Sequence, residues 1–170
     1  YMKGALNMTG GSITDNTGAS DGAVVVEDTQ DVINLSGNPV IFGNTNAQGK
    51  AANLYIGVDS DNVVNVKEPG LGDSAHIGVS AMEGHMAIGE QFGTADFEQT
   101  ANLGRFVNDV YGYRGKLKEG TSTNIVWDGL TIKINKVVDP VGANPNDRFT
   151  ITLSSMSINM STYIIDGTLD

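Results

Sequence analysis

The strongest constraint on the fold of this chain is an internal repeat near its start. Residues 7–10, NMTG, align with residues 34–37, NLSG, at an offset of 27, and residues 13–17, ITDNT, align with residues 41–45, IFGNT, at an offset of 28. The match continues where residues 24–26, VVV, correspond to residues 54–56, LYI. Each unit therefore contains about three short β-prone pieces that are separated by turn-forming Gly, Asn, Asp and Ser.

Short strands of this kind bury their apolar side chains only when successive units stack into coils. Such a stack predicts that Ile13 lies beside Ile41, and that residues 24–26 pair with residues 54–56 in the next coil. It also predicts that Asn16 and Asn44 form a short amide ladder. The alternative is an ordinary β-sandwich in which the two similar stretches have no structural relationship.

Composition supports an all-β chain and restricts its partners. The 170 residues include 22 glycines, which favour tight turns, and the formal net charge is −10, so a nucleic acid partner is not expected. The chain has no cysteine, which excludes disulfides, and no run of about 18 apolar residues, so we expect no membrane insertion of this fragment. It starts at Tyr1 without a signal-peptide pattern, and we interpret it as a monomeric fragment of a larger protein.

The stretches "MTGGSITDNTGASDGAVVV" and "NLSGNPVIFGNTNAQGKAANLYI" resemble the repeats of large bacterial surface proteins with right-handed parallel β-helices. The nearest likeness is to adhesin-like, cell-wall-associated proteins of Gram-positive gut bacteria, and "VVNVKEPGLGDSAHIGVSA" is similar to the ending of their last coils. The resemblance covers about residues 5–128. It implies an extracellular location at the cell wall and a right-handed β-solenoid whose C-terminal coils are closed by a cap at about residues 80–128.

The last third of the chain has a different pattern. Apolar and polar residues alternate over residues 130–135 and again over residues 148–153, which predicts antiparallel strands of a β-sandwich type. The sequence therefore suggests two parts, residues 1–128 and residues 129–170. The second part resembles the start of pilin-type isopeptide-linkage domains, which implies Lys136 as the reactive lysine, with Lys133 as a second choice. The partner Asn would lie beyond Asp170, so both lysines are otherwise expected to be ordinary solvated side chains.

Acidic residues follow two equivalent strands and are candidates for a metal site or a catalytic site. Glu27, Asp28, Asp59 and Asp61 would share one edge of the stack, where carboxylates can bind Ca²⁺ or serve a carbohydrate-active enzyme of the polysaccharide lyase or glycoside hydrolase type. Their spacing matches no calcium-loop motif, so a solvated acidic edge without metal is expected. We expect no cofactor and no enzymatic activity. The spacing of the two histidines, His76 and His85, is not that of a zinc site, and His76 is expected to point outward.

Aromatic residues concentrate in the segment that follows the coils. Tyr111, Tyr113 and Trp127, together with Arg114, are candidates for binding a host glycan or a host surface protein. The alternative, which we favour for the aromatic residues of this segment, is that they cover the open end of the solenoid. The sequence thus predicts a structural or adhesive module of a bacterial cell-surface protein, which acts as a stalk or as a ligand-presenting surface. A glycan-binding module is a further alternative.

Overall fold

The computed structural model describes residues 4–18, 22–59, 63–96 and 102–129. The chain divides into two compact units, residues 1–130 and residues 131–170, and the second lies outside the described residues. The predicted antiparallel strands of the C-terminal part and the candidate Lys136 therefore lie outside them as well.

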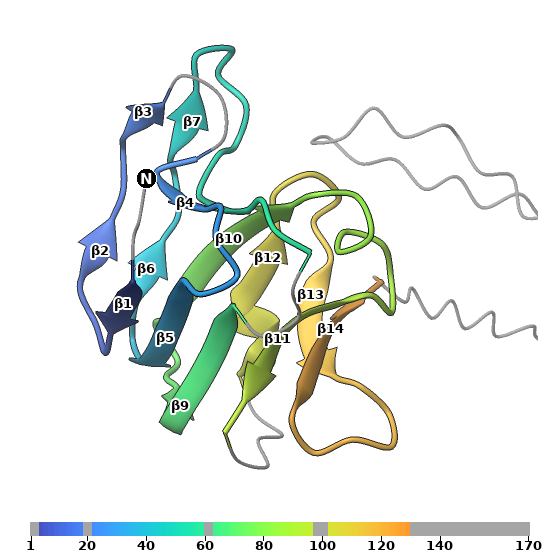
Figure 1. Ribbon diagram of the computed structural model, residues 1–170. Helices are drawn as coiled ribbons and strands as arrows, with labels where there is room; N and C mark the ends of the chain where they lie inside the picture. Colours follow the sequence, from blue (N-terminus) through green and yellow to red (C-terminus); the bar gives the residue numbers. More distant parts are fainter. Residues whose placement is uncertain (1–3, 19–21, 60–62, 97–101, 130–170) are drawn as a thin grey trace, which may run out of the picture. The chain divides into compact units, whose positions relative to one another are not determined.

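The first unit is a β-solenoid of about three turns, as the repeat predicted (Figure 1). Three coils contain β1 to β10, and the segment that follows contains β11 to β14 and one short 3-10 helix, η1. In the first coil the strands are β1 (Ala5–Met8), β2 (Ser12–Ile13), β3 (Thr17–Gly18) and β4 (Val24–Val26). In the second coil they are β5 (Val32–Gly37), β6 (Val40–Ile41), β7 (Thr45–Asn46) and β8 (Leu54–Ile56). The third coil has β9 (Val64–Leu71) and β10 (His76–Ala81), and the closing segment has β11 (Gln91–Ala95), η1 (Leu103–Arg105), β12 (Phe106–Asn108), β13 (Arg114–Leu117) and β14 (Asn124–Asp128).

The coils stack in the register that the repeat predicted. Ile13 pairs with Ile41, and Val24, Val25 and Val26 pair with Leu54, Tyr55 and Ile56. One row of parallel strands runs β1-β5-β9-β11 and a second runs β2-β6-β10-β12, while β4 and β8 form a third row that also pairs with β10. The strands contact through evenly spaced backbone hydrogen bonds, and their apolar side chains line the space between the rows.

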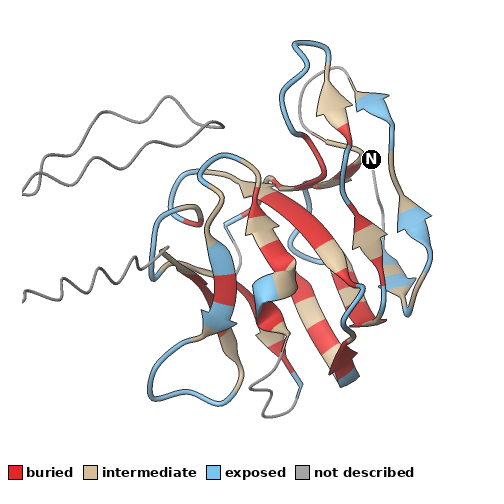
Figure 2. Cartoon of the chain, turned by 180° about the vertical axis from the view of Figure 1, so that it is seen from behind, coloured by how far each residue is buried: buried red, intermediate tan, exposed pale blue. Residues whose placement is uncertain are grey.

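The core lies between these rows and is completed by the closing segment (Figure 2). In the second and third coils, the inward-facing side chains are fully buried. The paired residues Ile33 and Val64 of the first row, and Ile41 and Ile77 of the second row, are all 0% exposed. The predicted apolar set of the third coil is buried: Val64, Val66, Leu71, Ile77 and Val79.

The hairpin β13–β14 closes the stack. β14 pairs antiparallel with β11 at the end of the first row, and β13 pairs antiparallel with β12 at the end of the second. The last strand of each row therefore has a partner, so the backbone groups at this end of the solenoid are not left as a free sheet edge.

The coils differ in how they pass one corner. In the second coil, residues 42–53 leave the stack between Ile41 and Leu54 and contain β7. In the first coil, β3 lies in the equivalent stretch, between β2 and β4. β3 and β7 pair with each other as a small separate sheet, which we call the side arm (Figure 1). In the third coil, Ile77 and Val79 pair with Ile41 and Leu54, and Gly78 alone covers the same step. A side chain at Gly78 would lie 2.3 Å from atoms of both Asn53 and Asp109, which explains why glycine stands there.

Candidate functional site

The predicted aromatic cluster separates into a buried group and a surface group. Trp127 and Phe106 are 0% exposed, together with Phe92, whereas Tyr111 is 48% exposed and Tyr113 is partly buried. The prediction that these aromatic residues form one surface for a ligand is therefore wrong for Trp127.

Trp127 covers the end of the core. Its ring stacks on Phe92 with centroids 3.8 Å apart, and Phe92 contacts Phe106 edge to face at 5.3 Å. The indole Nε1 donates a hydrogen bond to the backbone oxygen of His85 at 2.8 Å. A buried indole needs such a partner, and this one ties β14 to the loop before β11. Trp127 is thus positioned to stabilise the cap, not to stack on a sugar.

Tyr111 and Tyr113 remain at the surface as a pair. Their rings stack with centroids 5.2 Å apart, on the turn between β12 and β13. Asn108 fixes this turn, because its side-chain oxygen accepts hydrogen bonds from the backbone of Val110 at 3.0 Å and of Tyr111 at 2.9 Å. The turn thus presents an ordered aromatic pair directly before Arg114.

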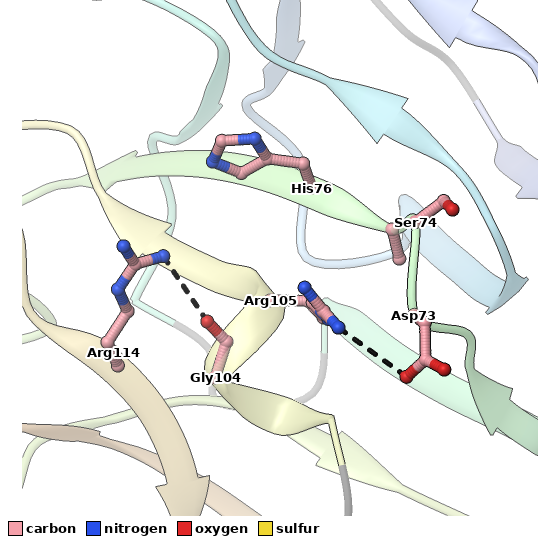
Figure 3. Close-up of a pocket in the computed structure, with 7 residues that line it drawn as sticks. Asp73, Ser74, His76, Gly104, Arg105 and Arg114 are labelled. Atoms are coloured by element: carbon pink, nitrogen blue, oxygen red, sulfur yellow. Dashed lines mark hydrogen bonds and ion pairs between the residues drawn. The ribbon is translucent and has the colours of Figure 1, made fainter.

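Arg114 lines a hollow of about 300 Å³ on the outer side of the second strand row (Figure 3). His76 from β10 and Arg105 from η1 line the same hollow, so basic side chains from three separate elements border it. We call this site the cationic hollow; its lining residues are Asp73, Ser74, Ala75, His76, Gly104, Arg105 and Arg114.

The arginines of the cationic hollow have only long contacts with neighbouring groups. The Nη2 of Arg105 lies 3.5 Å from a carboxylate oxygen of Asp73, whose side chain is 91% exposed. The Nη1 of Arg114 donates to the backbone oxygen of Gly104 at 3.4 Å. In the part of the chain that the structure describes, no carboxylate is within ion-pair distance of Arg114. Most of the hydrogen-bonding capacity of the two guanidinium groups therefore faces the hollow or solvent.

His76 completes the cationic hollow and adds an aromatic wall. Its ring stacks on Phe42 at 3.8 Å with an angle of 18° between the planes. Partial burial lowers the pKa of His76 below its usual value, and the positive charges of Arg114 and Arg105 lower it further. The imidazole is therefore neutral at pH 7, and the two arginines supply the charge.

The predicted acidic edge does not gather its carboxylates. Asp28 accepts a hydrogen bond from the backbone of Gln30 at 2.9 Å, within its own loop. Asp31, which follows in the same loop, is buried and accepts one from the backbone of Gly4 at 2.5 Å. Asp59 contacts the Nε2 of His85 at 3.1 Å, and Glu27 is exposed. These contacts hold loops in place.

Among the residues that the structure describes, no group of side chains forms a metal-binding cluster. Asp61 lies outside the described residues. His85 is buried, and its Nδ1 lies 2.8 Å from the backbone oxygen of Gln91. The ring thus connects Asp59 to β11 and lies beneath the cap. The convergence of Glu27, Asp28, Asp59 and Asp61 that a carbohydrate-active site requires is not seen for the described members of this set.

No protein-family model matches the chain, and no curated protein and no solved structure is significantly similar to it. Within the described segments, no helix has the length and apolar character needed to cross a membrane.

The cationic hollow combines residues that sequence reasoning treated separately. The sequence predicts that His76 points outward and groups Arg114 with the aromatic residues, but it does not predict that these two residues and Arg105 line one hollow. The signal lies in the register: Ile77 pairs with Phe106, so His76 and Arg105 each directly precede one residue of this pair. Extending the repeat into the cap by one more coil would have brought them together.

Proposed function

We propose that this chain is a structural and adhesive module of a bacterial cell-surface protein, in which a capped β-solenoid presents a ligand-binding surface on a stiff frame. The observation that carries the proposal is the closure of the stack: the hairpin β13–β14 pairs with the last strand of both rows. A stack that is continuous in register and closed at one end holds its surface loops in fixed positions.

The resemblance of the repeats to Gram-positive adhesin-like proteins supports an extracellular, cell-wall location. The likeness of residues 129–170 to the start of a pilin-type domain supports attachment to a longer stalk, with Lys136 as the candidate for a crosslink in the full-length protein. A crosslink of this kind releases ammonia, so the intact mass of the longer protein would fall by about 17 Da relative to its sequence.

A glycan-binding module is the second candidate, and the paired tyrosines favour it. Tyr111 and Tyr113 stack on each other on an ordered turn, and exposed tyrosine rings are suited to contact with sugar rings. Because Trp127 is buried, only these two of the three predicted aromatic residues are placed for such a contact.

A binding array tests both versions of the proposal. The 170-residue chain is applied to glycans and host surface proteins, beside Tyr111→Ala and the control Val110→Ala, which truncates an exposed neighbour in the same turn. Saturable binding by the native chain supports an adhesive module, and binding lost only in Tyr111→Ala assigns the contact to the tyrosine pair.

The same samples are assayed for release of sugar products from a panel of polysaccharides. Absence of any binding, or turnover of a polysaccharide, would contradict the proposal, and turnover would favour the enzyme alternative.

A further inference from the structure

The cationic hollow stands out against the charge of the whole chain. The sequence has 10 Lys and Arg residues against 20 Asp and Glu residues, yet Arg105, Arg114 and His76 come together from three separate elements. An acidic surface repels anions, so a local basic cluster is where an anionic group would be attracted.

The geometry of the hollow suits a small group with several acceptor oxygens. A guanidinium presents a planar fork of donors that matches a carboxylate or a sulfate, and here two such groups line one hollow. The volume of about 300 Å³ is at the lower end of the range for ligand pockets, which is room for a single charged sugar unit.

The wall of the hollow supports a ring as well as a charge. The ring of His76 lines the hollow together with the arginines, and Phe42, which is not a lining residue, stacks on this ring from outside the hollow. Ser74, exposed at the rim, adds a hydroxyl group that can donate or accept. An apolar face next to two cations is the combination that a sugar with an acidic substituent requires.

We infer that the cationic hollow binds an acidic sugar, through a carboxylate or sulfate group that is held by Arg105 and Arg114. This inference rests on the proposed adhesive function and names the chemical class of its ligand. Asp73 competes with that ligand, because its exposed carboxylate lies beside Arg105 and must give up this contact when the ligand binds.

Isothermal titration of the 170-residue chain tests the inference with matched ligands. The probes are a uronic acid oligosaccharide, its neutral counterpart with the carboxyl groups reduced, a sulfated oligosaccharide, and inorganic sulfate. Binding of the uronic acid or the sulfated sugar with at least tenfold preference over the neutral counterpart is expected. Inorganic sulfate alone should bind more weakly, because it has no sugar ring to pack against the ring of His76.

Three variants locate the binding in the hollow. Arg114→Gln and Arg105→Gln should each weaken binding at least tenfold, which is the ordinary effect of losing a charge-assisted hydrogen bond. Arg114→Lys keeps the charge but loses the fork and should fall between Arg114→Gln and the native chain. The control Lys118→Gln removes a positive charge from an exposed position elsewhere in the cap and should leave the affinity unchanged.

Asp73→Asn provides a test in the opposite direction. It removes the competing carboxylate without removing a ligand contact, so the affinity for the acidic sugar should rise by a few fold. A gain of this kind does not depend on whether the arginine variants fold as well as the native chain.

The pH dependence is a second readout. Protonation of His76 adds a third positive charge to the hollow, whose other charged lining residues are Arg105, Arg114 and Asp73. Because the pKa of His76 is lowered from 6.5, binding should strengthen only as the pH falls below 6.5 towards about 5.5, and the strengthening should be lost in His76→Gln. The ligand carboxylate stays ionised over this range.

The failures can be told apart. Equal affinity for the acidic sugar and its neutral counterpart, or an unchanged affinity in Arg114→Gln, would overturn the assignment of the hollow while an adhesive role remains supported. If neither acidic nor neutral glycans nor host proteins bind in the titrations and the array, the proposed function fails together with it.

Discussion

The two ends of the stack differ in how completely each coil is covered. At the capped end, Phe106 occupies the column that begins with Ile13, and it is fully buried beneath the cap. At the other end, Ile13 is only partly buried, although it pairs with Ile41 in register. In Figure 2 the central strands carry most of the buried positions, whereas β2 and β3 are largely exposed or intermediate. Register alone therefore does not bury a side chain; a layer on each side is required.

A second difference between the ends is polar. Asn16, Asn44, Asn53 and Asp109 form a chain of hydrogen bonds along the base of the side arm, which we call the polar ladder. Asn16 donates to the side-chain oxygen of Asn44 at 2.8 Å, and Asn44 donates to that of Asn53 at 3.0 Å. Asn53 in turn donates to a carboxylate oxygen of Asp109 at 2.7 Å. The ladder is buried at Asn44 and Asn53 and exposed at Asn16, which parallels the apolar columns.

The largest expected effect is at the cap. Trp127→Ala removes a fully buried ring and the hydrogen bond to His85, so the free energy of unfolding should fall by about 3–5 kcal/mol. Urea unfolding followed by circular dichroism measures this change. Tyr111→Ala is the control and should cost less than about 0.5 kcal/mol, because its ring is half exposed. Similar losses of unfolding free energy in the two variants would contradict the role of Trp127 in stabilising the cap.

The polar ladder should show a smaller but clear gradient. Asn44→Ala leaves the backbone oxygen of Ile13 without its side-chain donor and removes one of the two donors to the side-chain oxygen of the buried Asn53, so it should cost about 2 kcal/mol. Asn16→Ala removes an exposed member and should cost about 0.5 kcal/mol, measured by the same urea unfolding. Equal losses of unfolding free energy in the two variants would show that the contribution of a ladder residue does not depend on its burial.

The apolar column should show a gradient in the same direction. Ile13→Ala should cost about 1 kcal/mol, since the side chain is only partly buried, whereas Ile41→Ala in the same column should cost about 2–4 kcal/mol. The difference between the two costs is the measured quantity, and a cost for Ile13→Ala as large as that for Ile41→Ala would remove the distinction between the ends.

The smallest expected effect concerns the pH dependence of stability. Burial raises the pKa of Asp109 above its usual value, although the hydrogen bonds from Asn53 oppose the shift. The folded state then holds the proton more tightly than the unfolded state. The contribution of Asp109 to stability therefore increases as the pH falls through the raised pKa towards 3.8, and it decreases as the pH rises.

Comparison with Asp109→Asn isolates this contribution from the other acids. The stability difference between the native chain and Asp109→Asn should change in favour of the native chain between pH 7 and pH 4, as measured by thermal unfolding. A difference that is constant over this range would show that Asp109 has the same pKa in both states.

The sequence predicted what repeats and missed most of what occurs once. The pairing of Ile13 with Ile41, the pairing of Val24 with Leu54, and the contact between Asn16 and Asn44 follow from the repeat and are confirmed. Each depends on a position that is present in two adjacent coils, so the repeat specifies the neighbour. Burial of Trp127 has no counterpart in another coil, and the favoured alternative, that it covers the end of the core, is the one that the structure confirms.

The separation of the acidic residues could not be predicted for the same reason. Asp59 contacts His85, and Asp31 contacts the backbone of Gly4, and both contacts depend on loops that differ from coil to coil. The cationic hollow also depends on such loops, since Arg114 follows a turn that the repeat does not contain. The residues that we propose to bind a ligand therefore lie where the repetition ends.

The step at Gly78 has a consequence for engineering. One residue in the third coil spans the corner that residues 42–53 span in the second, while the strands on either side keep their pairing. The number of residues at this corner can thus differ between coils while the flanking strands keep the same register. Foreign peptides grafted at the exposed residues 47–50 would be displayed outside the frame without altering it, as long as Asn44 and Asn53 are kept.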